Sequence, residues 1–150
     1  MPELIHGTAI AIAGKAVLIR GPSGSGKSDL ALRCMAAAPG VIASAPALLV
    51  ADDQVLAWQN GGRLIVRAPD TIRGRMEVRG VGLVEVPFVA EAELVLVVDL
   101  VPPGTLSRMP EPKPPAEIAG TSVPCVDLDA AEVSAPFKLF LLLRQLLASI

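Results

Sequence analysis

The chain has 150 residues, a formal net charge of −2, 52% apolar residues, 3% aromatic residues and no tyrosine. This length fits one domain with a core of its own, and the lack of a basic cluster or an aromatic platform argues against a nucleic-acid partner. We expect neither a membrane span nor a secretory signal, because charges and prolines interrupt the apolar stretches and no basic region precedes an apolar run at the N-terminus.

Hydrophobic patterning and turn residues predict strands before and after one internal helix. Asn-Gly-Gly at 60–62 is a strong hairpin signal, because these residues accept the positive φ angles of tight turns. Cys34 and Cys125 lack C-x-x-C spacing, so we expect buried thiols in a cytoplasmic protein. In chain order, the predicted elements are two short strands within 3–20 joined at Gly14-Lys15, a helix over 29–38, a connection of open structure over 36–46, a buried strand over 48–51, a hairpin of 55–58 and 63–66, one helical turn at 69–72, an extended segment over 76–88 and a central strand over 92–100.

The last third of the chain is expected to begin with an irregular segment. Six prolines between 101 and 115 exclude regular structure, so we predict a mobile or extended loop. A C-terminal helix follows, with Ser134 as its cap and Pro136 in its first turn. This order of elements predicts an α/β fold with a mixed sheet, not strict strand–helix alternation.

Residues 21–28 match the phosphate-binding pattern G-x-x-x-x-G-K-[ST]. The glycines admit backbone angles that turn successive N–H groups toward a phosphate, and the following helix adds its positive N-terminal end. Lys27 would reach the β- and γ-phosphates, and the hydroxyl of Ser28 would hold Mg²⁺. The alternative is a glycine-rich turn without a ligand. The predicted nucleotide-binding positions of this loop are Gly21, Pro22, Ser23, Gly24, Ser25, Gly26, Lys27 and Ser28.

Phosphoryl transfer also needs acidic groups for Mg²⁺ and for the proton of the nucleophile. Asp52 and Asp53 end a buried strand, and their side chains should point to opposite faces, so we expect different roles for them. A solvated strand end is the alternative. Glu77 and Arg79 are expected to share one face of an extended segment. We favour a metal ligand beside a phosphate clamp there over a plain surface ion pair.

Two residues are ambiguous on chemistry alone. His6 is the only histidine, and a lone histidine on a strand is more often structural than catalytic. Arg108, in the proline-rich segment, could be a plain solvated charge. A resemblance bears on both. His6-Gly7, the loop at 21–28, Val50-Ala-Asp-Asp53 and Met76-Glu-Val-Arg-Gly-Val-Gly82 together resemble the catalytic domain of HPr kinase/phosphorylase. The loop alone is generic, but the combination is specific and extends from about Leu4 to Arg144.

That resemblance implies an enzyme that uses ATP to phosphorylate a serine on HPr, a phosphocarrier of the bacterial sugar phosphotransferase system, and that can reverse the modification by phosphorolysis. Asp53, the second acid of the pair, resembles the group that takes the serine proton. We expect His6 to orient Asp53 or to tune its acidity. The residues carried over by position are the catalytic His6, Lys27, Asp53 and Arg108 and the Mg²⁺ ligands Ser28 and Glu77. We also expect Asp52 and Arg79 to lie beside the nucleotide.

Two features depart from the pattern of that family. The family's usual enzymes carry an N-terminal regulatory domain, whereas this chain starts at the kinase domain and resembles short proteobacterial forms. An Arg/Pro/Gly/Arg/Asn-type segment implicated in dephosphorylation is replaced here by Val126-Asp-Leu-Asp-Ala-Ala131. We therefore expect kinase activity to dominate and phosphorolysis to be weak. The spacing from Lys27 to Asp53 is also lengthened by an apolar insertion at 37–46.

We interpret residues 1–150 as a single P-loop kinase domain of the HPr kinase/phosphorylase type, with a mixed β-sheet, a phosphate-loop helix and a C-terminal helix. Its expected cofactors are ATP and Mg²⁺, its expected partner is an HPr-like phosphocarrier, and the resemblance suggests a homo-hexamer. A small-molecule kinase on the same scaffold and a nucleotide-sensing module without catalysis are the alternatives. The intact Lys27, Ser28, Asp53 and Glu77 count against the second of these.

Overall fold

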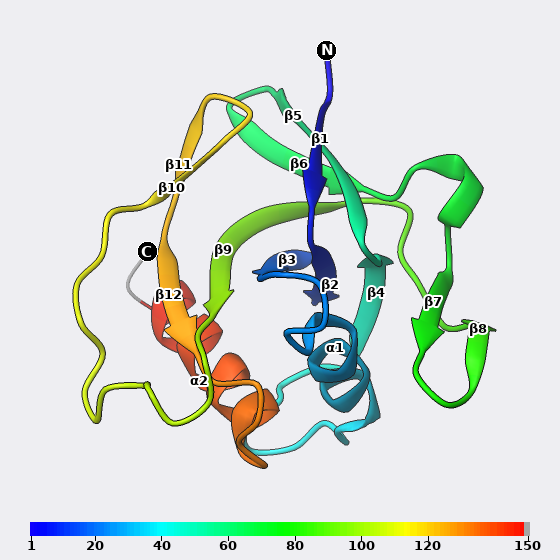
Figure 1. Cartoon of the computed structure of the whole chain (residues 1–150). Coiled ribbons are helices and arrows are strands. Elements are labelled where there is room, and N and C mark those ends of the chain that lie inside the picture. Colours follow the sequence, from blue (N-terminus) through cyan, green and yellow to red (C-terminus); the bar gives the residue numbers. More distant parts are fainter. Residues whose placement is uncertain (149–150) are drawn as a thin grey trace.

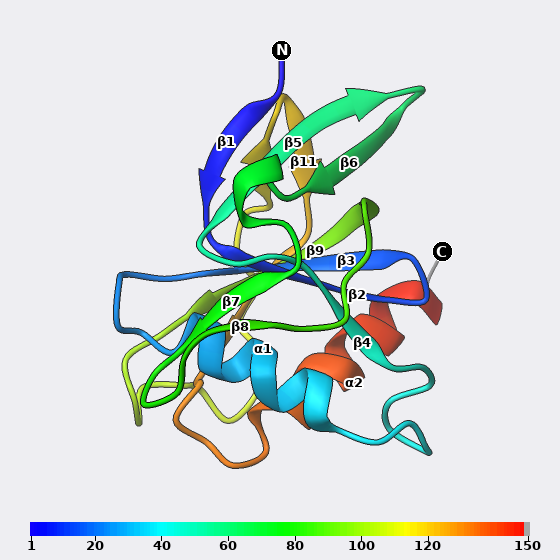
Figure 2. The same ribbon diagram turned by 90° about the vertical axis from the view of Figure 1, so that its right-hand side faces the viewer.

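Most strands form one curled sheet (Figures 1 and 2). Apolar side chains alternate along these strands and give the sheet a hydrophobic cluster on each face. The computed structural model describes residues 1–148. In chain order its elements are β1 (Glu3–His6), β2 (Thr8–Ile12), β3 (Lys15–Arg20), α1 (Lys27–Ala36), β4 (Ala47–Ala51), β5 (Gln54–Asn60), β6 (Arg63–Arg67), the 3₁₀ turn η1 (Asp70–Ile72), β7 (Arg75–Val78), β8 (Gly82–Glu85), β9 (Ala92–Leu100), β10 (Ala116–Ile118), β11 (Thr121–Val123), β12 (Cys125–Leu128) and α2 (Ala135–Ala148).

The main sheet is mixed, as the order of elements predicts. Its strand order is β1-β5-β6-β9-β3-β2-β4, and β12 also pairs with β9. Both β3 and β12 run parallel to β9, whereas the other neighbouring pairs are antiparallel. Because parallel strands end at the same edge of a sheet, the segments that follow β3, β9 and β12 all leave from one edge.

The two faces of the central strands carry side chains of different size. Ile10, Ile19 and Val98 point to the face that α1 and α2 cover. On the other face small residues such as Ala9 and Ala57 allow the sheet to curl over itself, so β1, β5 and β6 lie opposite the helices (Figure 2). Every one of these side chains is fully buried.

The prediction of two strands within 3–20 is wrong in one respect, because the chain forms three strands there. It bends at Gly7, so that β1 leaves the β2–β3 hairpin and pairs with β5 instead. A Cβ atom at Gly7 would lie 2.9 Å from both the Ile19 carbonyl oxygen and Leu18 Cδ1, so no larger residue fits this bend. The hairpin turn also lies one residue earlier than predicted, at Ala13 and Gly14, which both have positive φ.

Most other predicted elements are present. The central strand, the 60–62 hairpin and the helical turn near 70 are confirmed, and residues 101–115 contain neither helix nor strand. The terminal helix begins directly after Ser134, whose carbonyl accepts a hydrogen bond from Lys138 N. Cys34 and Cys125 are buried free thiols, as expected, and burial raises the pKa of Cys34 to about 12. Within residues 1–148, no helix is long and apolar enough to cross a membrane.

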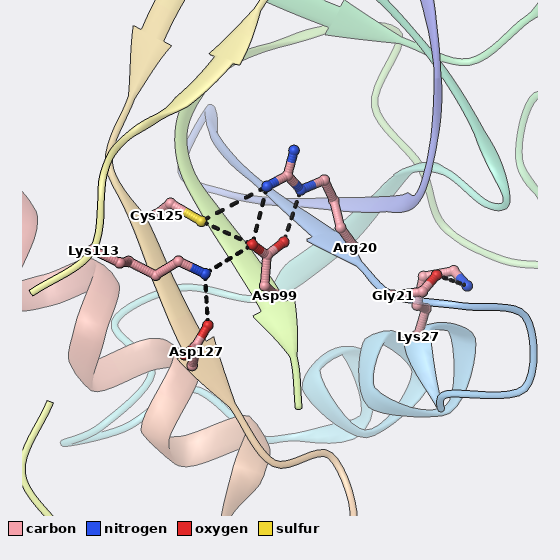
Figure 3. A network of polar contacts seen from close by, with 7 residues as sticks. All are labelled: Arg20, Gly21, Lys27, Asp99, Lys113, Cys125 and Asp127. Carbon is pink, nitrogen blue, oxygen red and sulfur yellow. Dashed lines mark hydrogen bonds and ion pairs between the residues drawn. The ribbon is translucent and has the colours of Figure 1, made fainter. Parts of the chain in front are cut away.

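A polar cluster closes the edge where β3, β9 and β12 end (Figure 3). Arg20 donates two hydrogen bonds to Asp99, of 2.7 and 3.0 Å, and Lys113 reaches both Asp99 at 3.0 Å and Asp127 at 2.7 Å. The Cys125 thiol also donates to Asp99. Burial raises the pKa of Asp99, but hydrogen bonds from Arg20, Lys113 and Cys125 outweigh that effect and hold the pKa at about 2. We call these five residues the Asp99 cluster.

The low pKa of Asp99 predicts that the free energy of unfolding decreases in acid. Because the carboxyl titrates at 3.8 when unperturbed and at about 2 in the fold, it contributes stability above pH 4 that is lost as the pH falls toward 2. The gap corresponds to about 2 kcal/mol. The difference in unfolding free energy between the wild type and Asp99→Asn, measured by urea denaturation, should therefore be large at pH 7 and shrink below pH 4. A difference that stays constant from pH 7 to 2.5 would contradict this.

Candidate active site

Residues 21–28, which the sequence predicts to bind phosphate and which we call the phosphate-binding loop, connect the end of β3 to the start of α1. Gly24 and Gly26 have φ angles of 80° and 100°, which only glycine adopts without strain, and a Cβ at Gly26 would meet Ala130 Cβ at 3.3 Å. Gly26 caps α1 without a side-chain hydrogen bond, so the first N–H groups of the helix keep their capacity for another acceptor. A helix end of this kind, reached through a glycine-rich loop, is suited to an anion.

Two side chains of this loop also fit a phosphate ligand. The hydroxyl of Ser25 is buried and has no hydrogen-bond partner within the described chain. Lys27 is buried, and its amine donates to the Gly21 carbonyl at 2.9 Å (Figure 3). The same amine donates to the Pro22 carbonyl at 3.1 Å. An ammonium group that has only carbonyl partners can exchange them for phosphate oxygens, which bind it more strongly.

Asp52 is the best-connected acid of the site. Its Oδ1 accepts hydrogen bonds from Ser28 Oγ at 2.6 Å and Thr8 Oγ1 at 3.0 Å, and its Oδ2 accepts one from the Glu77 backbone N–H at 3.1 Å. The residue is only 7% exposed. These bonds join β2, α1 and β7 to the end of β4, and they place the last hydroxyl of the phosphate-binding loop against a buried carboxylate.

Asp53 points elsewhere, but not through strand alternation as predicted, because β4 ends at Ala51 and both acids lie in the bend before β5. It has a φ of 68°, and its exposed carboxylate lies 3.1 Å from His6 Nε2. The Asp53 carbonyl accepts a hydrogen bond from Gly7 N, so the His-Gly bend and the pair of acids are held together through backbone as well as side chains. The structure thus brings His6, Asp52, Asp53, Lys27 and Ser28 into one site.

The β7–β8 hairpin places one predicted residue at this site and separates another from it. The backbone N–H of Glu77 donates a hydrogen bond to Asp52, so the residue lies beside that acid. The exposed side chain of Glu77 has no hydrogen bond or ion pair within residues 1–148. The expectation that Glu77 and Arg79 share a strand face is wrong, because β7 ends at Val78 and Arg79 lies in the glycine-rich turn. The φ of 83° at Gly80 belongs to that turn, which interrupts the alternation.

Arg108 lies in the proline-rich segment and has no partner among the described residues. Its side chain is exposed. The segment begins where β9 ends, and Arg20 and Asp99 are register partners on the parallel strands β3 and β9. The phosphate-binding loop and the segment with Arg108 therefore leave the sheet from neighbouring positions on the same edge.

Several residues of the site were not predicted from the sequence. Thr8, which bonds Asp52, looks like an ordinary β-branched strand residue, and only its hydroxyl beside the His-Gly pair hints at a polar role. Asp129 is 4% exposed and accepts hydrogen bonds from the backbone N–H groups of Gly104 and Ala131. Arg33 donates to the carbonyls of Ala130 and Glu132 and so fixes α1 to the same turn. These contacts join residues far apart in sequence.

The donors of the site suit Mg²⁺ better than a metal that needs a complete protein cage. Within residues 1–148, no group of three or more His, Cys, Asp or Glu residues is placed to hold a metal. Mg²⁺ keeps several waters and binds through one or two carboxylates together with substrate phosphates. The Ser28 hydroxyl, the adjacent Asp52 carboxylate and the exposed Glu77 match that kind of ligand set.

Known proteins resemble this chain in sequence. A family model described as the HPr Serine kinase C-terminal domain matches residues 2–134. The HPr kinase/phosphorylase of Lactobacillus acidophilus is 32% identical over 135 residues, which cover 83% of this chain and 39% of that protein. The enzyme of the same name from Burkholderia lata is 31% identical over 137 residues, covering 85% and 40%. The chain thus spans about two fifths of the length of these curated relatives.

A solved structure shares the fold. The Hpr(Ser) kinase/phosphatase from Coxiella burnetii superposes with a TM-score of 0.81 at 24% identity, and the match covers 98% of this chain and 92% of that one. The likeness confirms the predicted α/β fold with its mixed sheet, phosphate-loop helix and C-terminal helix.

Proposed function

The chain belongs to the family of the HPr serine kinase C-terminal domain, and from this membership and the geometry of its site we propose that it transfers the γ-phosphoryl group of ATP to a serine of an HPr-like phosphocarrier. One observation carries the proposal. The 2.6 Å bond from Ser28 to the buried Asp52 sets the end of the phosphate-binding loop beside a second acid, Asp53, which stays exposed and paired with His6. A loop that only bound nucleotide would need the first acid but not the second.

The cofactors of this reaction would be ATP and Mg²⁺. Residues 21–28 would hold the phosphates, with Lys27 exchanging its carbonyl partners for phosphate oxygens. Ser28, Glu77 and the adjacent Asp52 would hold Mg²⁺, which when bound neutralises charge on the β- and γ-phosphates. Arg79 and Arg108 are exposed cations without partners in the described chain, and they are free to contact phosphate oxygens.

Asp53 is the proposed proton acceptor. The serine Oγ of the acceptor protein attacks the γ-phosphorus, its proton passes to the Asp53 carboxylate, and the bond to the ADP oxygen breaks. The products are phosphoserine and ADP, with Asp53 protonated until it returns the proton to solvent. His6 orients the carboxylate through the 3.1 Å contact. Asp52 is unsuited to this role, since both of its oxygens already accept hydrogen bonds inside the protein.

The forward direction should dominate. Phosphorolysis brings a phosphoserine and inorganic phosphate together, so it needs added positive charge. The segment 126–131 supplies none: Asp127 is bonded to Lys113, and Asp129 accepts two backbone N–H groups. We propose that this chain acts in the cytoplasm as a kinase with weak reverse activity. A homo-oligomer, such as a hexamer, is part of the same proposal.

The most direct test is incubation with labelled ATP, Mg²⁺ and HPr proteins, followed by mapping of the phosphosite. We expect label on one serine of HPr. Lys27→Ala should abolish transfer and weaken nucleotide binding, because the loop keeps its glycine-determined shape but loses its cation. Lys15→Ala, at the other end of β3, is the matched control and should remain active. Label on a small molecule, or full activity of Lys27→Ala, would refute the proposal.

The two acids should differ in a pair of matched variants. Asp53→Asn should lower turnover by about 10²–10⁴-fold, the usual scale for loss of a general base, while binding of Mg²⁺–ATP changes little. Asp52→Asn should instead weaken Mg²⁺-dependent nucleotide binding, because an amide keeps only one of the two acceptor oxygens. Its N–H₂ would face either the Glu77 N–H or the Ser28 and Thr8 hydroxyls, so at least one of the present bonds to Asp52 is lost or must be reversed. Turnover measurements and calorimetric titration separate these effects. If Asp52→Asn removes turnover with binding intact and Asp53→Asn does not, the assigned roles are reversed.

A further inference from the structure

The segment from Gly104 to Lys113 is fixed at both ends, although it has no regular structure. At its second end, Lys113 Nζ bonds Asp99 at 3.0 Å and Asp127 at 2.7 Å (Figure 3). These two carboxylates are register partners on the parallel strands β9 and β12. Like charges placed directly opposite on neighbouring strands repel each other, so the pair creates a strong site for one cation. Lys113 fills it.

The first end of the segment is held by Asp129. Its Oδ2 accepts a hydrogen bond from Gly104 N at 2.9 Å, and its Oδ1 accepts one from Ala131 N. Ala130, between Asp129 and Ala131, lies close to the phosphate-binding loop. Gly26 has no Cβ, and one built there would lie only 3.3 Å from the Ala130 Cβ. This anchor therefore ties the start of the segment to the turn that packs on the phosphate-binding loop.

The second anchor also adjoins the phosphate-binding loop. Asp99 holds Lys113 on one side and the Arg20 guanidinium on the other, and Arg20 is the residue directly before Gly21. Hydrogen bonds to Asp127 and Asp99 raise the pKa of Lys113, so this ion pair persists across the neutral range. Both ends of the segment are thus tied to residues that adjoin the phosphate-binding loop.

The free part of the segment is short and stiff. Residues 105–112 include two of the prolines, which restrict the backbone, and Ser107 Oγ bonds Glu111 across the turn at 2.7 Å. Arg108 and the 71%-exposed Met109 lie in the middle of this part. An arginine on a short, anchored span loses less conformational entropy when it engages a phosphoryl group than one on an untethered loop.

We propose that Lys113 is a positioning residue, which with Asp129 anchors the segment 104–113 so that Arg108 is presented at the edge of the phosphate-binding loop. This inference rests on the proposed function for the role of Arg108, but the anchor itself does not. Lys113 touches no reacting atom in this scheme. It acts through the placement of Arg108.

The anchor can be tested without any assumption about activity. Trypsin should cleave after Arg108 slowly in the wild type and several-fold faster in Lys113→Met, because cleavage requires the segment to leave its anchored form. Lys113→Arg should restore slow cleavage, and Lys15→Met, which removes a comparable ion pair with Glu93 elsewhere, should leave it unchanged. The double variant Lys113→Met/Asp127→Asn no longer has an unpaired charge at position 127 but still lacks the anchor, so trypsin should still cleave it fast. Equal cleavage of wild type and Lys113→Met overturns the anchor, whether or not the chain phosphorylates HPr.

Kinetics then test the positioning role. In transfer to HPr, Lys113→Met should lower kcat by about 10- to 100-fold, the scale expected from misplacement of a catalytic group, with the KM for ATP unchanged. In an Arg108→Ala background the same change should have no further effect on kcat. Fast cleavage with unchanged kcat, or additive losses of kcat, would contradict positioning of Arg108. Absence of transfer by the wild type would instead refute the proposed function and with it the role of Arg108, while the proteolysis result would still decide the anchor.

Discussion

The three hydrogen bonds to the buried carboxylate of Asp52 are the constraint on which the site depends. A carboxylate that is removed from water is costly unless it is fully bonded, and each bond to a charged group contributes about 1.5–3 kcal/mol. Thr8, Ser28 and the Glu77 backbone supply those bonds from three different elements. The satisfaction of one buried charge therefore fixes the phosphate-binding loop, the β7–β8 hairpin and the strand end relative to one another.

The position next to Asp52 follows from the same constraint. Because the chain must turn after Asp52 is buried, Asp53 takes a left-handed φ of 68°, which Asp tolerates better than most residues, and its carboxylate emerges on the surface beside His6. Gly7 donates to the Asp53 carbonyl and leaves no room for a side chain, which explains why glycine follows the histidine. Two adjacent acids thus acquire different environments, one dry and bonded, one exposed and oriented.

Local patterns predicted much of this architecture, and long-range contacts account for what was missed. Glycine spacing was sufficient to predict the turn between β3 and α1, and the valine-rich run was sufficient to predict β9. The break at Gly7 depends on β1 pairing with β5, and the turn at Arg79 depends on where the β7–β8 pairing ends. The partnership of Lys113 with Asp99 and Asp127 arises from the register of parallel strands. None of these contacts leaves a periodic signal in the sequence.

We propose that Asp52 and Ser28 hold the phosphate-binding loop ready for Mg²⁺–ATP while Asp53 faces the phosphoryl group. A crystal structure with Mg²⁺ and a non-hydrolysable ATP analogue tests it most directly. We expect the phosphates to be wrapped by residues 21–28, Lys27 to have left the Gly21 and Pro22 carbonyls, and Asp53 with His6 to lie on the γ-phosphate side of the site. Phosphates bound elsewhere on the chain, or an Asp53 carboxylate turned away from the γ-phosphate while Asp52 faces it, would contradict the account.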